Sequence, residues 1–137
     1  MTDREHKAYR YLSRLWRIDR EIRDKEEELR SIGLVQGVRY DRDNVQTSPI
    51  DPMDRVSDII GEIEQEKEEY IRVKHTLINE IHGIEDAVYE QILVERFIDG
   101  RSIKQIHFRH GGHPSTVYRT FCRALSAFAD KYANKCN

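Results

Sequence analysis

Apolar residues spaced three and four apart run through most of this chain, and this spacing constrains its fold more than any other feature. The first series crosses a highly charged segment and is interrupted at Lys25: Ala8, Tyr11, Leu15, Ile18, Ile22, Leu29 and Ile32. Positions three and four apart share one face of a helix, so we expect one long amphipathic helix with a narrow, coiled-coil-like stripe. Gly33 marks its expected end.

A second series of the same kind follows after residue 55: Val56, Ile59, Ile60, Ile63, Tyr70, Val73, Leu77, Ile81 and Ile84. The acidic run Glu62 to Glu69 lies between these positions and is expected to face solvent. Two long helices joined by a connection commonly pair antiparallel. The sequence therefore predicts an antiparallel helical hairpin over residues 1–84.

The connection between the two helices is expected over Leu34 to Asp54, a segment with glycines, prolines and many polar side chains. A connection of this length has a function or is only partly ordered. Asp51 or Asp54 is the expected N-cap of the second helix, since short carboxylate side chains accept from the free amides of a first turn.

A third, shorter helix is predicted from Val88, Ile92, Leu93 and Phe97, after a bend at Gly83 and before a stop at Asp99 and Gly100. It would cover the two helices that follow. Its acidic residues, Glu85, Asp86, Glu90 and Glu95, are expected to form a solvated face, because no nucleophile or phosphate loop accompanies them. We therefore do not expect an enzyme.

Residues 102–128 combine several local signals for a pair of helices. Ser102 and Gln105 fit a capping box, Ile103, Ile106 and Phe108 supply apolar bulk, and Gly111–Gly112 can adopt the positive φ of a turn. A second helix is expected to start at His113 with Pro114 at its first position. Its apolar stripe is at Val117, Phe121, Leu125 and Phe128.

The opposite face of this second helix is polar, with side chains that bond phosphates and base edges. A helix, a glycine turn and a helix with such a face are typical of a helix-turn-helix, whose second helix enters the major groove. An ordinary helical hairpin is the alternative. We predict a DNA-binding domain over residues 85–137, with these contact residues: Arg101, Lys104, Arg109, His113, Ser115, Thr116, Tyr118, Arg119 and Arg123.

The charge distribution is compatible with such a site. The chain of 137 residues is 35 % charged and has a net charge of −2. Residues 96–123, however, contain six Lys and Arg against one acid, Asp99, which gives +5 locally. At physiological salt the Debye length is about 8 Å, so distant acids do not prevent this segment from binding phosphates.

The segment from Val88 to Leu125 resembles region 4 of bacterial sigma factors, and more closely the sigma-region-4-like phage regulators of the ArpU type. The positions that carry the resemblance are Ser102, Ile106, Gly111, Val117, Tyr118, Arg119, Ala124 and Leu125. Residues 37–49 are similar to the interhelical segment of those proteins. The departures are His107, His110 and His113, which replace a small, an apolar and a capping residue.

The resemblance implies a phage-derived transcriptional regulator that binds double-stranded DNA and controls late or lytic genes. The alternative is a helical adaptor that binds RNA polymerase or another protein and reads little DNA itself.

We also weighed a zinc site, since His107, His110, His113 and Cys122 are potential ligands. The glycine turn and the buried side of the second helix separate them, so we expect neither a metal nor a cofactor. No apolar run is long enough to span a membrane and no signal peptide is evident, so a cytoplasmic location with reduced cysteines is expected.

Finally, a homodimer is expected. Regulators of this class commonly pair two reading units on successive turns of the groove. The stripe from Ala8 to Ile32 exceeds what the second helix would cover, and the excess would form the contact between the two copies.

Overall fold

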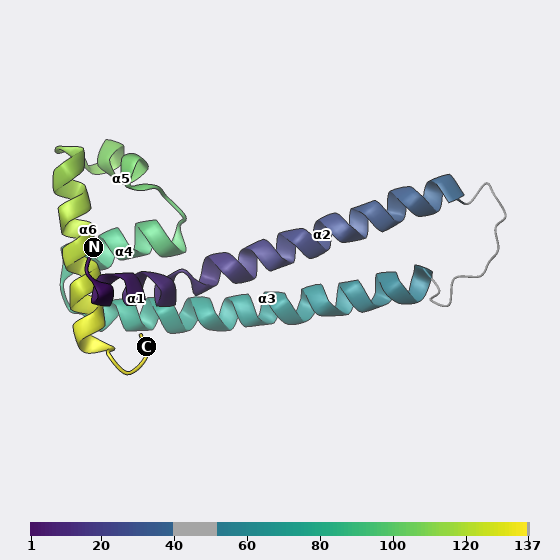
Figure 1. The fold of residues 1–137 in the computed structure, drawn as a ribbon, viewed down its shortest axis with the longest axis horizontal. Coiled ribbons are helices and arrows are strands. Elements are labelled where there is room, and N and C mark those ends of the chain that lie inside the picture. The colour runs from purple at the N-terminus through teal and green to yellow at the C-terminus, as the bar shows by residue number, and fades with distance from the viewer. Residues whose placement is uncertain (40–51, 137) are drawn as a thin grey trace. The chain divides into compact units, whose positions relative to one another are not determined.

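The structure is a computed structural model that describes residues 1–39 and 52–136, with side chains at 1–32 and 53–136. Within these ranges it is helical and contains no strand, which confirms the all-α prediction. In chain order (Figure 1), the elements are α1 (Asp3–Leu12), α2 (Arg14–Arg39), α3 (Pro52–His82), α4 (Ala87–Leu93), the π-helical turn η1 (Val94–Ile98), α5 (Ile103–His110) and α6 (Pro114–Lys131).

The described residues form two units, and the boundaries between them fall inside α2 and α3. Unit 1 consists of Met1–Trp16 and Arg72–Asn137, and unit 2 consists of Arg17–Ile71. This division differs from the predicted boundary after residue 84. One reason is that α1 packs on α6.

The long first helix predicted up to Gly33 is wrong at two points. It is broken at Ser13, whose hydroxyl donates to the carbonyl of Arg10 at 3.1 Å, a local bond that competes with helix continuation. The second segment, α2, then continues through Gly33 to Arg39. A glycine inside a helix costs only about 1 kcal/mol relative to alanine, so Gly33 does not have to end it.

The predicted connection from Leu34 to Asp54 is correspondingly shorter. α3 already begins at Pro52, a residue suited to the first helical position, so Asp54 lies in the first turn and is not the cap. Asp51, the other predicted cap, falls outside the described residues. Most of residues 37–49, the segment similar to the interhelical segment of the phage proteins, also falls outside them.

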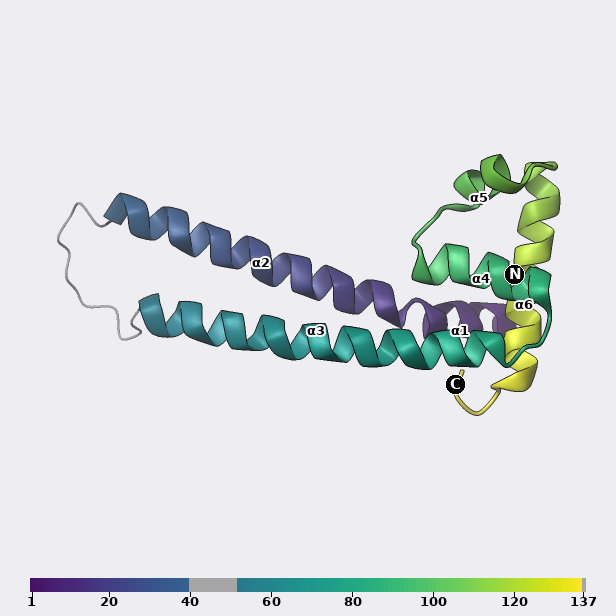
Figure 2. The ribbon, with the colours of Figure 1, turned by 180° about the vertical axis from the view of Figure 1, so that it is seen from behind.

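In unit 2 the segments of α2 and α3 lie side by side and run antiparallel (Figures 1 and 2). Ile22, Ile59 and Ile63 are buried between them, and four partly buried residues pack around this cluster: Ile18, Leu29, Ile32 and Tyr70. The predicted stripe is therefore largely correct here. Ile60 is an exception, because 43 % of it is exposed.

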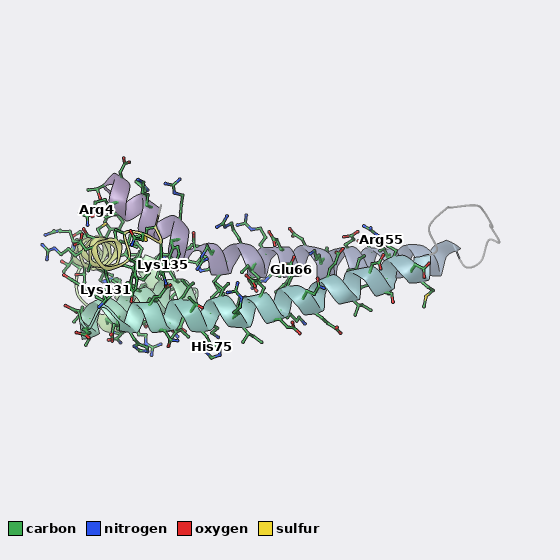
Figure 3. The ribbon with its side chains drawn as sticks, turned by 90° about the horizontal axis from the view of Figure 1, so that it is seen from below. Arg4, Arg55, Glu66, His75, Lys131 and Lys135 are labelled. Carbon is green, nitrogen blue, oxygen red and sulfur yellow. The ribbon has the colours of Figure 1, made fainter. Side chains whose placement is uncertain are left out.

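Ion pairs join the two helices beside this apolar cluster. Lys25, which interrupts the stripe of α2, reaches across to donate to Glu66 of α3 at 2.5 Å, and the bond raises the pKa of the lysine. Arg55 of α3, which is labelled in Figure 3, forms a second pair with Glu28 of α2. A lysine with a long apolar stem can occupy a seam position when its ammonium finds a carboxylate at the edge.

In unit 1 helix α6 packs on α1, α4 and α5. Its buried face consists of Phe121, Ala124, Leu125, Phe128 and Ala129. The ring of Phe97, from η1, stacks between Trp16 at 5.1 Å and Phe121 at 5.9 Å. Arg4 of α1 pairs with Asp130 of α6. Aromatic burial of this kind supplies most of the stabilisation that holds α6 in place.

Helix α4 and the turn η1 occupy the predicted third helix. Asp86 caps α4 by accepting from the amides of Val88 and Tyr89, both at 3.1 Å. Gly100, with φ +74°, follows the end of η1, as predicted. The expected burial of Val88 is wrong, since 61 % of it is exposed.

A buried carboxylate, Glu80 of α3, ties the C-terminal residues to α1. It accepts from the hydroxyl of Tyr11 at 2.7 Å and from the ammonium of Lys135 at 2.7 Å. Burial and the bond to Glu80 raise the pKa of Tyr11 well above its usual range. Glu80 is only 6 % exposed, so these two donors offset its loss of hydration.

Candidate nucleic-acid interface

The first helix of the candidate interface, α5, begins with the predicted capping box. The hydroxyl of Ser102 accepts from the amide of Gln105 at 3.2 Å, and the side chain of Gln105 accepts from the amide of Ser102 at 2.9 Å. Only Ile106 of this helix is buried. The two reciprocal bonds satisfy amides that have no partner inside the helix, and they fix its first residue.

The turn after α5 has the conformation that only glycine adopts readily. Gly111 has φ 77° and ψ −167°, and Gly112 has φ +83°. The prediction of a positive φ at Gly111 is therefore confirmed. A Cβ atom at Gly111 would meet no neighbour within 4 Å, so the requirement comes from the backbone and not from crowding.

Helix α6 starts as predicted, with His113 as its cap and Pro114 at its first position. The Nδ1 atom of His113 accepts from the amide of Ser115 at 3.2 Å and lies 2.7 Å from the hydroxyl of Ser115. His113 thus caps the helix through its ring nitrogen, as the hydroxyl of a serine at this position would. Figures 1 and 2 show α5 beside the N-terminal end of α6.

The two faces of α6 are separated as the sequence predicts. On one side Phe121, Leu125 and Phe128 are buried, and Val117 is half-buried. The five predicted contact residues of this helix are all exposed, with Tyr118 at the edge of the buried face and the other four on the opposite side: Ser115, Thr116, Tyr118, Arg119 and Arg123. The arrangement exposes hydroxyl, phenol and guanidinium groups, although the hydroxyl of Ser115 is already bonded to His113.

The expectation that Glu95 faces solvent is wrong. Two predicted DNA-contact residues, Arg101 and Arg109, bond to its buried carboxylate. Glu95 is 4 % exposed. It accepts from Arg101 at 3.0 Å, lies 3.3 Å from the Nε atom of Arg109, and lies 2.5 Å from the Nε2 atom of His110. This clasp, formed by Glu95, Arg101, Arg109 and His110, joins η1 to both ends of α5.

A signal for the clasp was present in the sequence. Glu95 follows the buried Ile92 by three residues, which places it on the same side of a helix. Glu95 lies one residue before the segment 96–123, so the local charge of +5 does not include it. Arg96 is also internal, since it donates to the hydroxyl of Tyr9 at 3.2 Å and lies over the ring of Trp16 at 4.4 Å.

The bases that remain available are Lys104, Arg119 and Arg123. All three are exposed, and none has an ion-pair partner among the residues whose side chains are described. The positive charge available on the candidate interface is therefore carried by three residues and not by all six Lys and Arg of residues 96–123.

A cleft of about 340 Å³ lies beside the clasp. Its lining comes from α4, η1 and neighbouring segments: His82, Ala87, Glu90, Gln91, Val94, Glu95, Asp99, Arg101 and Arg109. Acids and bases are mixed here, and the two arginines are bonded to Glu95. This lining contains no Ser, Thr or Cys that could act as a nucleophile.

The histidines considered as zinc ligands are used separately. His110 bonds Glu95, His113 caps α6, and His107 is half-buried with its Nδ1 atom enclosed. Within the described ranges no group of three potential ligands is close enough to hold a metal. Phe108, which was expected to add apolar bulk to this helix, is 74 % exposed on α5.

Compared with protein-family models, curated proteins and solved structures, the chain has no match. None of the helices in residues 1–39 and 52–136 is long and apolar enough to cross a membrane.

Proposed function

We propose that this chain is a sequence-specific DNA-binding transcriptional regulator in which α5, the glycine turn and α6 act as a helix-turn-helix that follows an antiparallel helical hairpin. One observation carries the proposal. Helix α6 is anchored by a continuous buried face while its opposite face, beginning at the capped N-terminus, exposes Ser115, Thr116 and Arg119.

This face has the chemistry that a reading helix requires. Ser115 and Thr116 stand in the first turn of α6, where their exposed side chains and the positive end of the helix dipole favour contact with phosphate oxygens. Arg119 follows one turn later, at a position suited to the acceptor edge of guanine. Lys104 and Arg123 would contact phosphates on either side.

The biological role in the proposal comes from the resemblance to sigma-region-4-like phage regulators. The features that support it are the Ser102 cap, the positive φ of Gly111 and the exposure of Arg119. We propose control of phage late or lytic genes from a promoter that the protein reads directly.

Selection of bound sequences from random duplex DNA, followed by affinity measurements at several salt concentrations, tests the proposal. We expect an enriched motif. Arg119→Ala should weaken binding to this motif by about 1–3 kcal/mol if the arginine contacts a guanine, with relaxed preference at one base. Arg20→Ala removes the same charge from an exposed site in unit 2 and serves as the control.

Absence of an enriched motif, or equal affinity for Arg119→Ala and the wild type while both remain folded, would contradict the proposal. A uniform loss over all sequences with a smaller salt slope would instead assign Arg119 to a phosphate.

A second candidate is a helical adaptor that binds RNA polymerase or another protein, and the 74 % exposure of Phe108 favours it. Exposed aromatic side chains are common anchors of protein interfaces. In that case Phe108→Gln should abolish capture of purified RNA polymerase and Arg119→Ala should not. The DNA-reading proposal predicts instead that Arg119→Ala weakens DNA binding and that Phe108→Gln leaves it unchanged.

A further inference from the structure

Helix α3 carries a second stripe beside the one that packs on α2. In unit 2 its buried residues are Ile59 and Ile63. One residue further along, Ile60, Glu64, Lys67 and Ile71 follow each other at intervals of four, three and four, and all are exposed. We call these four residues the outer stripe. This is the spacing of a coiled-coil seam, rotated by about 100° from the buried one.

The outer stripe is unusual because it exposes large apolar side chains. Ile60 is 43 % exposed and Ile71 is 56 % exposed, although both belong to a helix whose remaining surface is strongly charged. The two isoleucines lie three turns apart on one line, with one acid and one base between them. Such a pattern on a helix is typical of contact with another helix.

We propose that the outer stripe binds the outer stripe of a second copy of this chain, in antiparallel orientation. In this register Ile60 meets Ile71 of the second copy, and Glu64 meets Lys67 of the second copy. The interface is isologous, so each of these contacts occurs twice about the two-fold axis.

The order of charges along the outer stripe indicates both that the binding partner is a second copy of this chain and that the two copies run antiparallel. The stripe reads apolar, acid, base, apolar, and an antiparallel copy places apolar against apolar and acid against base at every position. A parallel copy in register would place Glu64 against Glu64 and Lys67 against Lys67, which is repulsive. Self-complementarity of this kind is what a two-fold contact requires.

The charged members of the stripe are available for this contact. Glu64 has no ion pair among the described side chains, and Lys67 is 58 % exposed with only a long 3.9 Å contact to Glu26. The adjacent acids Glu62 and Glu66 are directed to Lys25 of α2, which reduces repulsion between two copies of this acidic segment.

The dimer contact predicted from Ala8 to Ile32 has no such surface. Ala8, Leu15 and Ile22 are 0, 1 and 7 % exposed, because each packs inside its own unit. Ile18, Leu29 and Ile32 are partly buried against the cluster between α2 and α3, so this stripe offers a second copy less apolar surface than the sequence predicts. Among the described side chains of unit 2, the exposed large apolar residues all lie on α3: Met53, Ile60 and Ile71.

Sedimentation equilibrium of the full chain, without DNA, tests the inference independently of the proposed function. We expect the mass to rise with concentration from 16.3 kDa toward twice that value. Glu64→Lys and Lys67→Glu should each weaken self-association by about tenfold, since each turns two attractive contacts into repulsive ones. The double variant Glu64→Lys/Lys67→Glu restores opposite charges and should regain most of the affinity.

Ile71→Glu should abolish the dimer, whereas Val88→Glu, at a 61 % exposed apolar position in unit 1, should not. All these positions are exposed, so circular dichroism should show folded protein throughout. A wild type that stays at 16.3 kDa at 100 micromolar or more overturns the inference, as does a double variant that associates no better than the single ones.

Discussion

Helices α5 and α6 lie side by side in unit 1, but different forces hold them. Helix α6 buries five residues, among them Phe121, Leu125 and Phe128. Helix α5 buries only Ile106, and its C-terminal end is held by Arg109 and His110 on the carboxylate of Glu95. One helix is therefore anchored by a continuous apolar face, and the other by a single buried side chain together with an ionic clasp.

These two kinds of anchoring distribute stability unevenly over the candidate interface. Apolar burial contributes about 25 cal/mol for each Å² removed from water and tolerates small shifts of position. A buried ion pair repays little more than its own desolvation, so it fixes orientation more than it adds stability. We expect α6 to open only when unit 1 unfolds, and α5 to open locally at lower cost.

The largest expected effect comes from the apolar anchor. Phe121→Ala should lower the free energy of unfolding by about 3–5 kcal/mol, because it leaves a cavity beside Phe97 and Tyr9. Chemical denaturation followed by circular dichroism measures the loss. A change below about 1 kcal/mol would mean that α6 is not the anchor of unit 1.

The turn between the two helices should show the next largest effect. Gly111 has φ 77° and ψ −167°, a region that only glycine populates readily, so Gly111→Val should cost about 1–3 kcal/mol. Gly61→Ala is the control, because this helical glycine also has open space around it. It should stabilise by up to about 1 kcal/mol. Wild-type melting of Gly111→Val would show that the turn lies elsewhere.

The clasp itself should have a smaller and local effect. Glu95→Gln keeps the shape of the side chain but removes the charge that faces Arg101 and Arg109, both of which are partly exposed. The expected cost is about 1–2 kcal/mol. Hydrogen exchange should quicken at the amides of α5 and stay unchanged in α6. Equal acceleration in both helices, or none, would remove the distinction between them.

Glu90→Gln provides a matched control in the same cleft. Its carboxylate lies 3.7 Å from His82, and among the described side chains it forms no ion pair with an arginine or histidine of α5. Hydrogen exchange in α5 should therefore match that of the wild type.

The sequence predicts local features of this region better than the contacts between its elements. The Ser102 cap, the positive φ of Gly111 and the start of α6 at Pro114 all follow from backbone preferences of single residues. The burial of Glu95 depends on Arg101, which precedes α5, and on Arg109 and His110 at the end of α5. Helical periodicity alone does not predict such a contact.

The same distinction applies to the N-terminal half. The buried stripe of α2 and α3 follows from the three-four spacing, but the break at Ser13 comes from a hydroxyl bond to the carbonyl of Arg10. Whether such a bond interrupts a helix depends on the tertiary packing on both sides of it. The spacing of Leu12 and Leu15 is compatible with either outcome.

The smallest expected effect tests the outer face of α5. Phe108 is 74 % exposed, so Phe108→Gln removes little buried area, and the free energy of unfolding should change by less than about 0.5 kcal/mol. Ile106→Ala, two residues earlier and buried, is the contrast and should cost about 2–5 kcal/mol. Thermal melting of the two variants measures both. If Phe108→Gln lost as much stability as Ile106→Ala, α5 would carry a second apolar contact, and its dependence on the clasp would be disproved.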